Sequence, residues 1–257
     1  GNQMFQCATG YSVARKNDVK LSLDLRRFTR RQDHNGFELQ KVFDIHSKVN
    51  FLDNSLFFCL INVKELLHKI DITYSKFNEP HFHYTNKILN ISKHSKLNGY
   101  WQSELYFKDY TEEIKKIFSF STQLDEKNLS IANEIKQKNS ISIHIRRGDY
   151  LLKNNSNHNT DLKKYYLRAI QNTSKFYSSP KYFIFTDDPI WVSKNFTLDY
   201  SSKIININQG ERSFLDMYLM SLCKSNIIAN SSFSWWSAWL NSNKDKIIYA
   251  PKNWFND

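Results

Sequence analysis

The stretch Ser140-Ile-Ser-Ile-His-Ile-Arg-Arg-Gly-Asp149 decides the fold of this 257-residue chain. Its first residues alternate and are rich in β-branched side chains, which predicts a strand. On such a strand the three isoleucines face one side, whereas Ser142, His144 and Arg146 face the other. Because desolvated guanidinium groups need anionic partners, Arg146 and Arg147 indicate that the strand ends at a cleft. A bound diphosphate or a strand-end cluster of ion pairs would each satisfy the two arginines.

Strand-like and helix-like stretches alternate along the second half of the chain. Alternating or β-branched runs predict strands, and apolar residues at helical spacing predict the helices between them. This alternation predicts a parallel sheet with helices on both faces. The expected strands are 140–147, 181–186, 203–207, 226–229 and 246–250, and the expected helices are 161–176, one that Pro189 opens, 211–223, and 233–240 capped by Ser232.

Three polar segments follow strands of this expected sheet, namely His144–Asp149, Thr186–Asp188 and Asn230–Phe233. Ligands of such sheets bind beyond the carboxyl ends of the strands, so these segments form the candidate site. For the two aspartates of the second segment three roles stay open: metal ligation, recognition of a nucleotide base, and capping of the following helix. The third segment, continued to residue 236, predicts a phosphate-binding helix start, a capped aromatic core helix, or both.

The first half of the chain carries weaker signals. Residues 28–98 are irregular and aromatic, and the opening Gly1-Asn2 could form a glycine turn that cradles a phosphate. The expected elements are helices at 2–16, 112–118 and 124–138, a strand at 19–25 and an extended stretch at 100–107. We therefore expect two domains, divided as 1–130 and 131–257.

Composition narrows the classes of function. The net charge of +11 fits nucleic acid, an anionic membrane or a phosphorylated small molecule as partner, or a solvated surface, because the basic residues form no long block. Cys7, Cys59 and Cys223 show no C-x-x-C spacing, which argues against a disulfide framework or a zinc site and favours a reducing cytosol. No apolar run reaches the roughly 18 residues that a membrane-spanning helix needs.

Five motifs occur along nearly the whole chain. They are GNQMFQCATG at 1–10, GYWQSELYF at 99–107, ISIHIRRGDY at 141–150, FIFTDDPIWV at 183–192 and DMYLMSLCKSNIIANSSFSWWSAWLN at 216–241. Together they resemble glycosyltransferase family 11, the bacterial α-1,2-fucosyltransferases. In that family's pattern a β-strand precedes the first motif and a Trp-containing segment follows Pro251–Phe255, and both are expected to be missing from this chain.

The resemblance implies an α/β fold of the GT-B kind, in which two Rossmann-like domains face a cleft. Residues 1–130 would form the acceptor side, and residues 131–257 would bind GDP-β-L-fucose. It further implies inverting transfer of L-fucose to the 2-hydroxyl of a galactose-terminated glycan. No metal or other cofactor is expected, because the sequence lacks a D-x-D triplet and arginines would supply the charge stabilisation.

The resemblance also implies roles for single residues. Arg146 and Arg147 would hold the donor diphosphate and stabilise the departing GDP, and Asp149 is the first candidate for the base. The other residues implied to contact the donor or to position those groups are His144, Asp187, Asp188, Asn230, Ser231, Ser232, Phe233, Ser234 and Trp235, with Gly1 and Asn2 on the opposite side of the cleft.

Two other classes of function stay open. One is a glycosyltransferase that uses a different nucleotide sugar or acceptor, and the other is a non-catalytic basic protein that binds nucleic acid or membrane. No nucleic-acid-binding motif occurs, so nucleic acid is not an expected partner. The favoured location is the cytoplasm, where the +11 charge would allow peripheral contact with the anionic inner face of a bacterial membrane.

Overall fold

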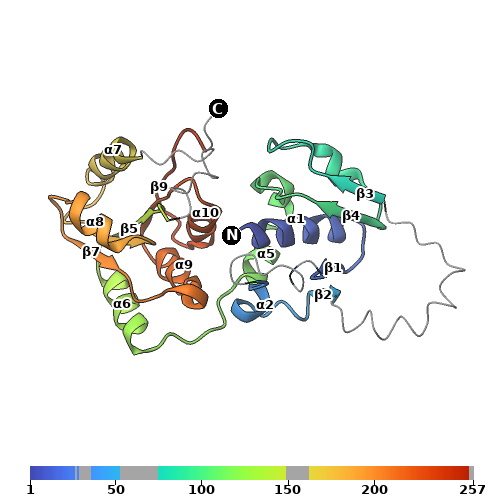
Figure 1. Cartoon of the computed structure of the whole chain (residues 1–257), viewed down its shortest axis with the longest axis horizontal. Coiled ribbons are helices and arrows are strands. Elements are labelled where there is room, and N and C mark those ends of the chain that lie inside the picture. Colours follow the sequence, from blue (N-terminus) through green and yellow to red (C-terminus); the bar gives the residue numbers. More distant parts are fainter. Residues whose placement is uncertain (27, 29–35, 53–74, 149–161, 255–257) are drawn as a thin grey trace, which may run out of the picture. The chain divides into compact units, whose positions relative to one another are not determined.

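The computed structural model of the chain describes residues 1–26, 28, 36–52, 75–148 and 162–254 (Figure 1). The chain divides into two compact units, of which one holds residues 2–122 and the other holds residues 123–257 together with Gly1. This division falls earlier than the expected boundary after residue 130. The reason is that helix α6, Glu126–Gln137, packs against the sheet of the second unit and shares its core.

The second unit is built on a five-stranded parallel sheet, as the alternation of elements predicts. Strand β5, Ser140–Ile145, lies at its centre. On one side of β5 lie β6, Lys181–Thr186, and then β7, Ser202–Ile205. On the other side lie β8, Ser225–Ile227, and β9, Ile248–Tyr249. The chain order of the strands therefore reverses between β5 and β8, which makes that gap the switch point of the sheet.

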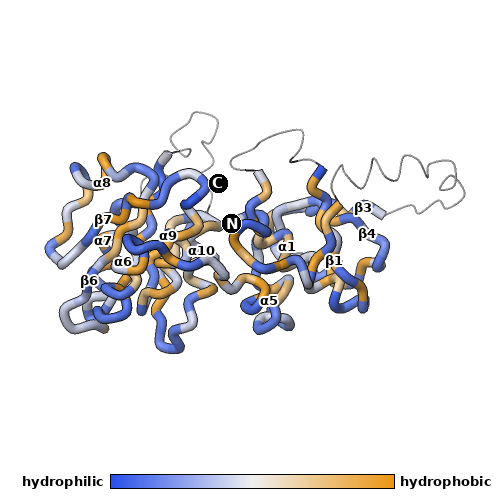
Figure 2. Tube along the Cα trace, turned by 90° about the horizontal axis from the view of Figure 1, so that it is seen from below, coloured by the Kyte–Doolittle hydropathy of each residue, from blue (hydrophilic) through white to orange (hydrophobic). Residues whose placement is uncertain are grey.

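Helices cover both faces of this sheet because alternate strand residues point to opposite sides. The isoleucines of β5 pack with α7, Lys163–Thr173, and with Val192 of α8, Pro189–Asn195. On the opposite face, Phe183 and Phe185 pack with α6 and with α9, Phe214–Ser221. Ser142 lies on that second face and accepts a hydrogen bond from Asn226 Nδ2 at 2.7 Å. Figure 2 shows that hydrophobic stretches run through the interior of this unit.

Side-chain caps fix the starts of two helices at the carboxyl ends of strands. Asp188 precedes α8 and accepts a hydrogen bond from Trp191 N at 3.0 Å, with Pro189 in the first turn as predicted. Helix α10 spans Ser232–Leu240, and its cap is Ser231, whose hydroxyl accepts from Phe233 N. The sequence-based choice of Ser232 as the cap was therefore wrong by one residue, because Ser231 is the residue with extended backbone angles.

In the part of the first unit that the structure describes, one long helix lies with two short parallel sheets. Helix α1 spans Asn2–Lys16, the predicted range. Strands β1, Leu21–Asp24, and β2, Val49–Leu52, pair in parallel, as do β3, Ser75–Asn78, and β4, Ser95–Asn98. Among its described residues the short helices are α2 (Leu39–Val42), η1 (Asn86–Asn90), η2 (Glu104–Tyr106), η3 (Lys108–Tyr110) and α5 (Thr111–Ile117).

The segment 100–107 is not extended, contrary to the sequence-based expectation. Trp101 has a φ of 59° and is almost fully buried, and the 3₁₀ helix η2 follows it. Ser103 caps this helix by accepting from Leu105 N at 3.3 Å. Burial of the Trp101 ring therefore overrides the extended backbone that the local sequence favours.

Helices that could cross a bilayer are not found among the described residues, since none is both long and apolar enough. The expected peripheral contact with an anionic membrane stays a prediction.

Replacement of Ile143 by alanine should destabilise the second unit. Ile143 has no exposed surface, so the substitution should lower the free energy of unfolding by about 2–5 kcal/mol. Ile190→Ala is the matched control, because Ile190 is 68% exposed, and it should change stability by less than about 0.5 kcal/mol. Urea unfolding followed by tryptophan fluorescence reports on this unit, since five of the six tryptophans lie at positions 191–254. Equal losses in the two variants would contradict the core position of Ile143.

Candidate functional site

The carboxyl edge of the five-stranded sheet gathers the polar segments that the sequence singled out. The turn Arg146–Gly148 follows β5, Asp187 and Asp188 follow β6, and the start of α10 follows β8. The first and third of these segments flank the switch point between β5 and β8. A parallel α/β sheet binds its ligands at this point, because the connections on its two sides diverge there.

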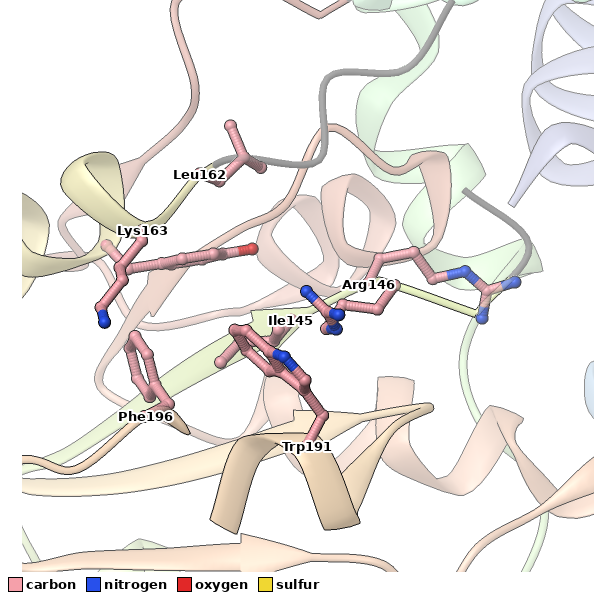
Figure 3. A pocket seen from close by; sticks show the side chains of 8 residues that line it. Ile145, Arg146, Leu162, Lys163, Trp191 and Phe196 are labelled. Carbon is pink, nitrogen blue, oxygen red and sulfur yellow. The ribbon is translucent and has the colours of Figure 1, made fainter. Parts of the chain in front are cut away.

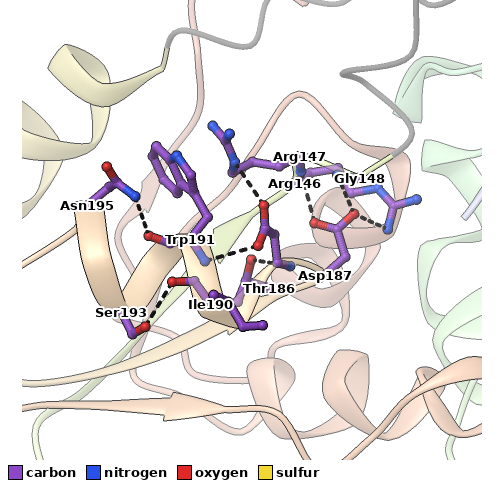
Figure 4. Close-up of polar contacts among 10 residues, drawn as sticks. Arg146, Arg147, Gly148, Thr186, Asp187, Ile190, Trp191, Ser193 and Asn195 are labelled. Carbon is purple, nitrogen blue, oxygen red and sulfur yellow. Dashed lines mark hydrogen bonds and ion pairs between the residues drawn. The ribbon is translucent and has the colours of Figure 1, made fainter.

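The carboxylate of Asp187 holds the turn that follows β5 (Figure 4). Its Oδ1 accepts from Arg147 N at 2.9 Å, and its Oδ2 accepts from Gly148 N at 3.0 Å. The same Oδ2 lies 3.0 Å from Nη1 of Arg146. A Cβ at position 148 would lie 2.7 Å from Asp187 Oδ2. Glycine is therefore needed here for the close approach of a carboxylate.

Helix α8 holds the second arginine from two sides. The Oδ2 of Asp188 lies 3.4 Å from Nε of Arg147, while its Oδ1 caps the helix. The indole of Trp191 lies beneath the guanidinium, whose Cζ is 3.5 Å from the ring centroid. Ion pairing at one edge and stacking on one face hold Arg147 in place, with only 16% of its side chain exposed. Among the three roles left open for Asp188, capping is the one observed.

A cavity of about 190 Å³ opens beside the two arginines (Figure 3). Figure 3 shows Leu162 on the side opposite Trp191 and Phe196. The lining residues are Ile145, Arg146, Arg147, Leu162, Lys163, Tyr166, Trp191 and Phe196. Sequence reasoning singled out only the two arginines among them. The position of Trp191 in the motif FIFTDDPIWV, three residues after a helix-capping aspartate, is the signal that could have identified it.

His144 lies on the other side of β5 and does not line this cavity. Its ring is buried, and its centroid lies 5.6 Å from that of Phe233 in α10. Burial, helped by the nearby charge of Arg146, lowers the pKa of His144 to about 3, so the imidazole is neutral at physiological pH. Its Nδ1 has no hydrogen-bond partner among the residues that the structure describes. Contact of His144 with a donor stays a prediction.

The start of α10 is a capped helix with an aromatic core. Ser234 is fully buried and donates to the carbonyl of Ser231 at 3.3 Å, and Asn230 donates to the carbonyl of Trp254 at 3.1 Å. These two side chains therefore serve the backbone, whereas Ser232 and Phe233 are partly exposed. The Trp235 ring stacks within the helix on Trp239, with the ring centroids 6.3 Å apart. Phosphate binding at this helix start stays a prediction.

The remaining predicted site residues fall in three places. Gly1 belongs to the second unit, where a Cβ on it would lie 2.4 Å from Oγ of Ser232. Asn2 belongs to the first unit, and its Oδ1 accepts from Gln102 Nε2 at 2.8 Å. Asp149 lies outside the described residues. In the described part of the chain, no three His, Cys, Asp or Glu side chains are grouped as a metal site.

A buried carboxyl group that sequence reasoning missed lies near the start of α9. Asp216 is 8% exposed, and its Oδ1 accepts from Asn208 Nδ2 at 2.8 Å. Asn208 also donates to Asn128 Oδ1 of α6 at 2.8 Å, so this network joins two helices that cover the same face of the sheet. Burial raises the pKa of Asp216 to about 7, although the Asn208 hydrogen bond opposes the shift.

A parallel sheet with arginines and a capped helix start at its switch point is typical of nucleotide-binding α/β proteins. The family model described as "Glycosyl transferase family 11" matches residues 1–257. The chain belongs to this family and is a glycosyltransferase, as the ordered motifs indicated.

Two relatives from Escherichia coli match nearly the whole chain. The "Alpha-1,2-colitosyltransferase" is 35% identical over 99% of this chain and 89% of its own length. The "O-antigen biosynthesis glycosyltransferase WbnK" is 31% identical over 99% of this chain and 92% of its own length.

The solved structure of the alpha-1,6-fucosyltransferase NodZ, co-crystallised with GDP, resembles this chain. Its TM-score is 0.53 at 15% identity, over 91% of this chain and 86% of that one. The NodZ structure from Bradyrhizobium gives a TM-score of 0.52 at 14% identity, over 91% and 87%. At such identities the likeness concerns the fold, and it confirms the expected α/β, GT-B-like class.

Replacement of Asp216 by asparagine should change how stability depends on pH. The native pKa of about 7 lies above the ordinary value of 3.8, so between these values the native state keeps a proton that the unfolded state has lost. The neutral carboxyl therefore makes its full contribution to the free energy of unfolding below about pH 4. This contribution is lost as the pH rises to 7, at about 1.4 kcal/mol per pH unit. The amide that Asp216→Asn introduces would still accept from Asn208 but cannot ionise.

The free energies of unfolding of wild type and Asp216→Asn should agree near pH 4 and diverge toward pH 7, with the variant more stable. Urea titrations at a series of pH values measure this difference. Asp199→Asn, at an exposed position, controls for the loss of a surface carboxylate. Parallel curves for wild type and Asp216→Asn would show that Asp216 does not titrate in this range.

Proposed function

We propose that this enzyme transfers L-fucose from GDP-β-L-fucose to the 2-hydroxyl of a terminal galactose, with inversion and without a metal ion. The observation that carries the proposal is the arginine turn at the switch point of the sheet, in a chain that belongs to glycosyl transferase family 11. A glycosyltransferase needs a cationic site for the phosphate that leaves, and the two arginines of this turn support that role.

The geometry of the arginines suits a diphosphate. Arg146 keeps 32% of its side-chain surface exposed at the carboxyl edge, and a guanidinium can bind two phosphate oxygens at once. Asp188 and Trp191 already hold the side chain of Arg147 in one position. Binding of a phosphate would therefore cost this side chain little conformational entropy. The start of α10 could add backbone N–H donors. The GDP present in the NodZ crystal supports GDP as the leaving group.

The reaction places specific demands on these residues. The acceptor oxygen attacks C1 of fucose, the bond from C1 to the β-phosphate oxygen breaks, and GDP departs with the bonding electrons. Arg146 and Arg147 would offset the negative charge that grows on that phosphate. The acceptor proton must pass to a base, for which Asp149 remains the first candidate. His144 is a poor base, because its pKa is about 3 and its ring is buried.

A second donor has specific support. The relative that is 35% identical to this chain is named a colitosyltransferase, and colitose is L-fucose without its 3-hydroxyl. A donor site that binds the diphosphate and the sugar face would accept both sugars unless a polar group recognises the 3-hydroxyl. GDP-colitose is therefore the alternative donor for the same linkage.

A donor panel with a galactose-terminated acceptor tests the proposal. GDP-fucose should give product, UDP- and CDP-linked sugars should give none, and chelation of metals by EDTA should leave the rate unchanged. Mass and linkage analysis of the product identify the sugar and the hydroxyl. Product from GDP-colitose alone would establish the alternative donor, whereas product from UDP-sugars alone would reject both.

Arg146→Ala should lower kcat for fucosyl transfer by roughly 100-fold or more, the size expected when one donor to a developing anion is removed. A radiolabelled-transfer assay at saturating GDP-fucose measures this loss. The matched control is Arg168→Ala, because Arg168 is an exposed arginine of α7 in the same unit, and this variant should keep its activity. Full activity in Arg146→Ala would remove Arg146 from the proposed donor site.

A further inference from the structure

We infer that two exposed aromatic rings in the first unit, Phe82 and Tyr100, form a platform for one pyranose ring of the acceptor glycan. This inference rests on the proposed function only in identifying the bound sugar as the acceptor. The two rings are called the aromatic platform below.

The rings of the aromatic platform lie together on the surface of the first unit. Phe82 is 57% exposed and Tyr100 is 46% exposed. Their ring centroids are 6.2 Å apart and their planes are inclined by 36°. Single exposed aromatics are common, whereas two adjacent exposed rings offer a contiguous apolar surface on which a ligand can pack.

A rigid support holds this platform in place. Glu79 follows β3 and Gly99 follows β4, so both lie at the same end of a parallel strand pair. The Glu79 carboxylate accepts from Tyr100 N at 2.7 Å and from Trp101 N at 3.0 Å. A Cβ at position 99 would lie 2.4 Å from Cβ of Glu79, so glycine permits this approach. The backbone of Tyr100 is therefore fixed independently of its side chain.

Backbone strain next to the platform adds a second indication of function. Trp101 adopts a φ of 59°, which bulky residues rarely do, and its ring is buried between Phe77 and Tyr106. The Tyr106 hydroxyl accepts from Thr85 N at 3.1 Å and so ties down the segment that carries Phe82. Backbone strain of this kind persists only where the surrounding contacts enforce the strained conformation, and it is concentrated at binding sites.

The chemistry of the platform fits a neutral sugar. A pyranose ring has one face of C–H bonds, which packs on aromatic faces, and a rim of hydroxyls that need hydrogen-bonding partners. The neighbouring His81 and His83 are exposed, and their imidazoles can both donate and accept hydrogen bonds. The two platform rings carry no charge that would favour a phosphate or a carboxylate over a sugar.

The platform lies on a segment tied to the start of α1. Gln6 Nε2 donates to the carbonyl of Gly99 at 2.8 Å, and Gln102 Nε2 donates to Oδ1 of Asn2 at 2.8 Å. Both hydrogen bonds join the segment that carries Tyr100 to helix α1 of the same unit. The proposed function identifies the bound sugar as the acceptor, because the donor diphosphate is assigned to the arginine turn of the second unit.

Saturation-transfer NMR on the full chain tests the platform directly, with methyl β-D-galactopyranoside as the probe. The wild type should bind the glycoside, and Tyr100→Ala and Phe82→Ala should each weaken binding roughly tenfold, the loss expected for one stacking ring. Tyr100→Phe keeps the ring and should bind as the wild type does. Leu105→Ala is the matched control, because Leu105 is 46% exposed on the same segment.

The inference would be overturned if the wild type did not bind the glycoside, or if Tyr100→Ala and Phe82→Ala both bound it as tightly as the wild type does. It would also be overturned if the wild type bound acyclic sorbitol, which has no pyranose face, as tightly as the glycoside. Circular dichroism and GDP titration of each variant confirm folding, and Phe82→Ala replaces Tyr100→Ala if the latter does not fold. Weaker GDP binding in both folded variants would also overturn it, since the platform would then serve the nucleotide.

A transfer assay separates failure of the platform from failure of the proposed function. If fucose is transferred, the two variants should raise KM for the acceptor roughly tenfold and leave KM for GDP-fucose unchanged. If no fucose is transferred although the glycoside binds to the platform, the donor assignment fails and the platform stands. Normal acceptor KM in both variants would reject the platform and leave the donor proposal intact.

Discussion

The site depends on the contacts of the Asp187 carboxylate. It accepts from the backbone amides of Arg147 and Gly148 and pairs with the guanidinium of Arg146. Strand pairing makes this possible, because the register of β5 and β6 sets Ile145 opposite Thr186 and so brings the residues that follow both strands together. Gly148 permits the approach, and helix α8 then holds Arg147 through Asp188 and Trp191. The positions of both arginines therefore depend on the contact that Asp187 makes with the turn.

A similar arrangement occurs in the first unit. There Glu79, which follows one strand of a parallel pair, accepts from two successive amides that follow the neighbouring strand, and Gly99 permits the approach. In both units a carboxylate beyond the strand ends fixes a turn by accepting hydrogen bonds from two of its backbone amides. Two arginines belong to the turn in one unit, and the partly exposed ring of Tyr100 belongs to the turn in the other.

Much of the second unit could be predicted from the sequence because its signals are local. The alternation of Ile141, Ile143 and Ile145 with polar residues set the strand and its two faces, and Pro189 set the start of α8. Trp191 was missed because its role depends on a guanidinium that comes from a different strand end. The segment 100–107 was misjudged because the burial of Trp101 imposes a φ of 59° that no local pattern signals. The order of the motifs was enough to indicate the family. The contacts of the site depend on the register of the strands, which the sequence does not reveal.

The central claim is that the arginine turn makes the diphosphate the recognised part of the donor. Calorimetric titration of the full chain with GDP, GMP and guanosine, at low and high salt, tests it most directly. We predict that affinity falls in that order, that GDP binds at least roughly 100-fold more tightly than guanosine, and that salt reduces this difference. Equal affinities for GDP and guanosine, unaffected by salt, would contradict it.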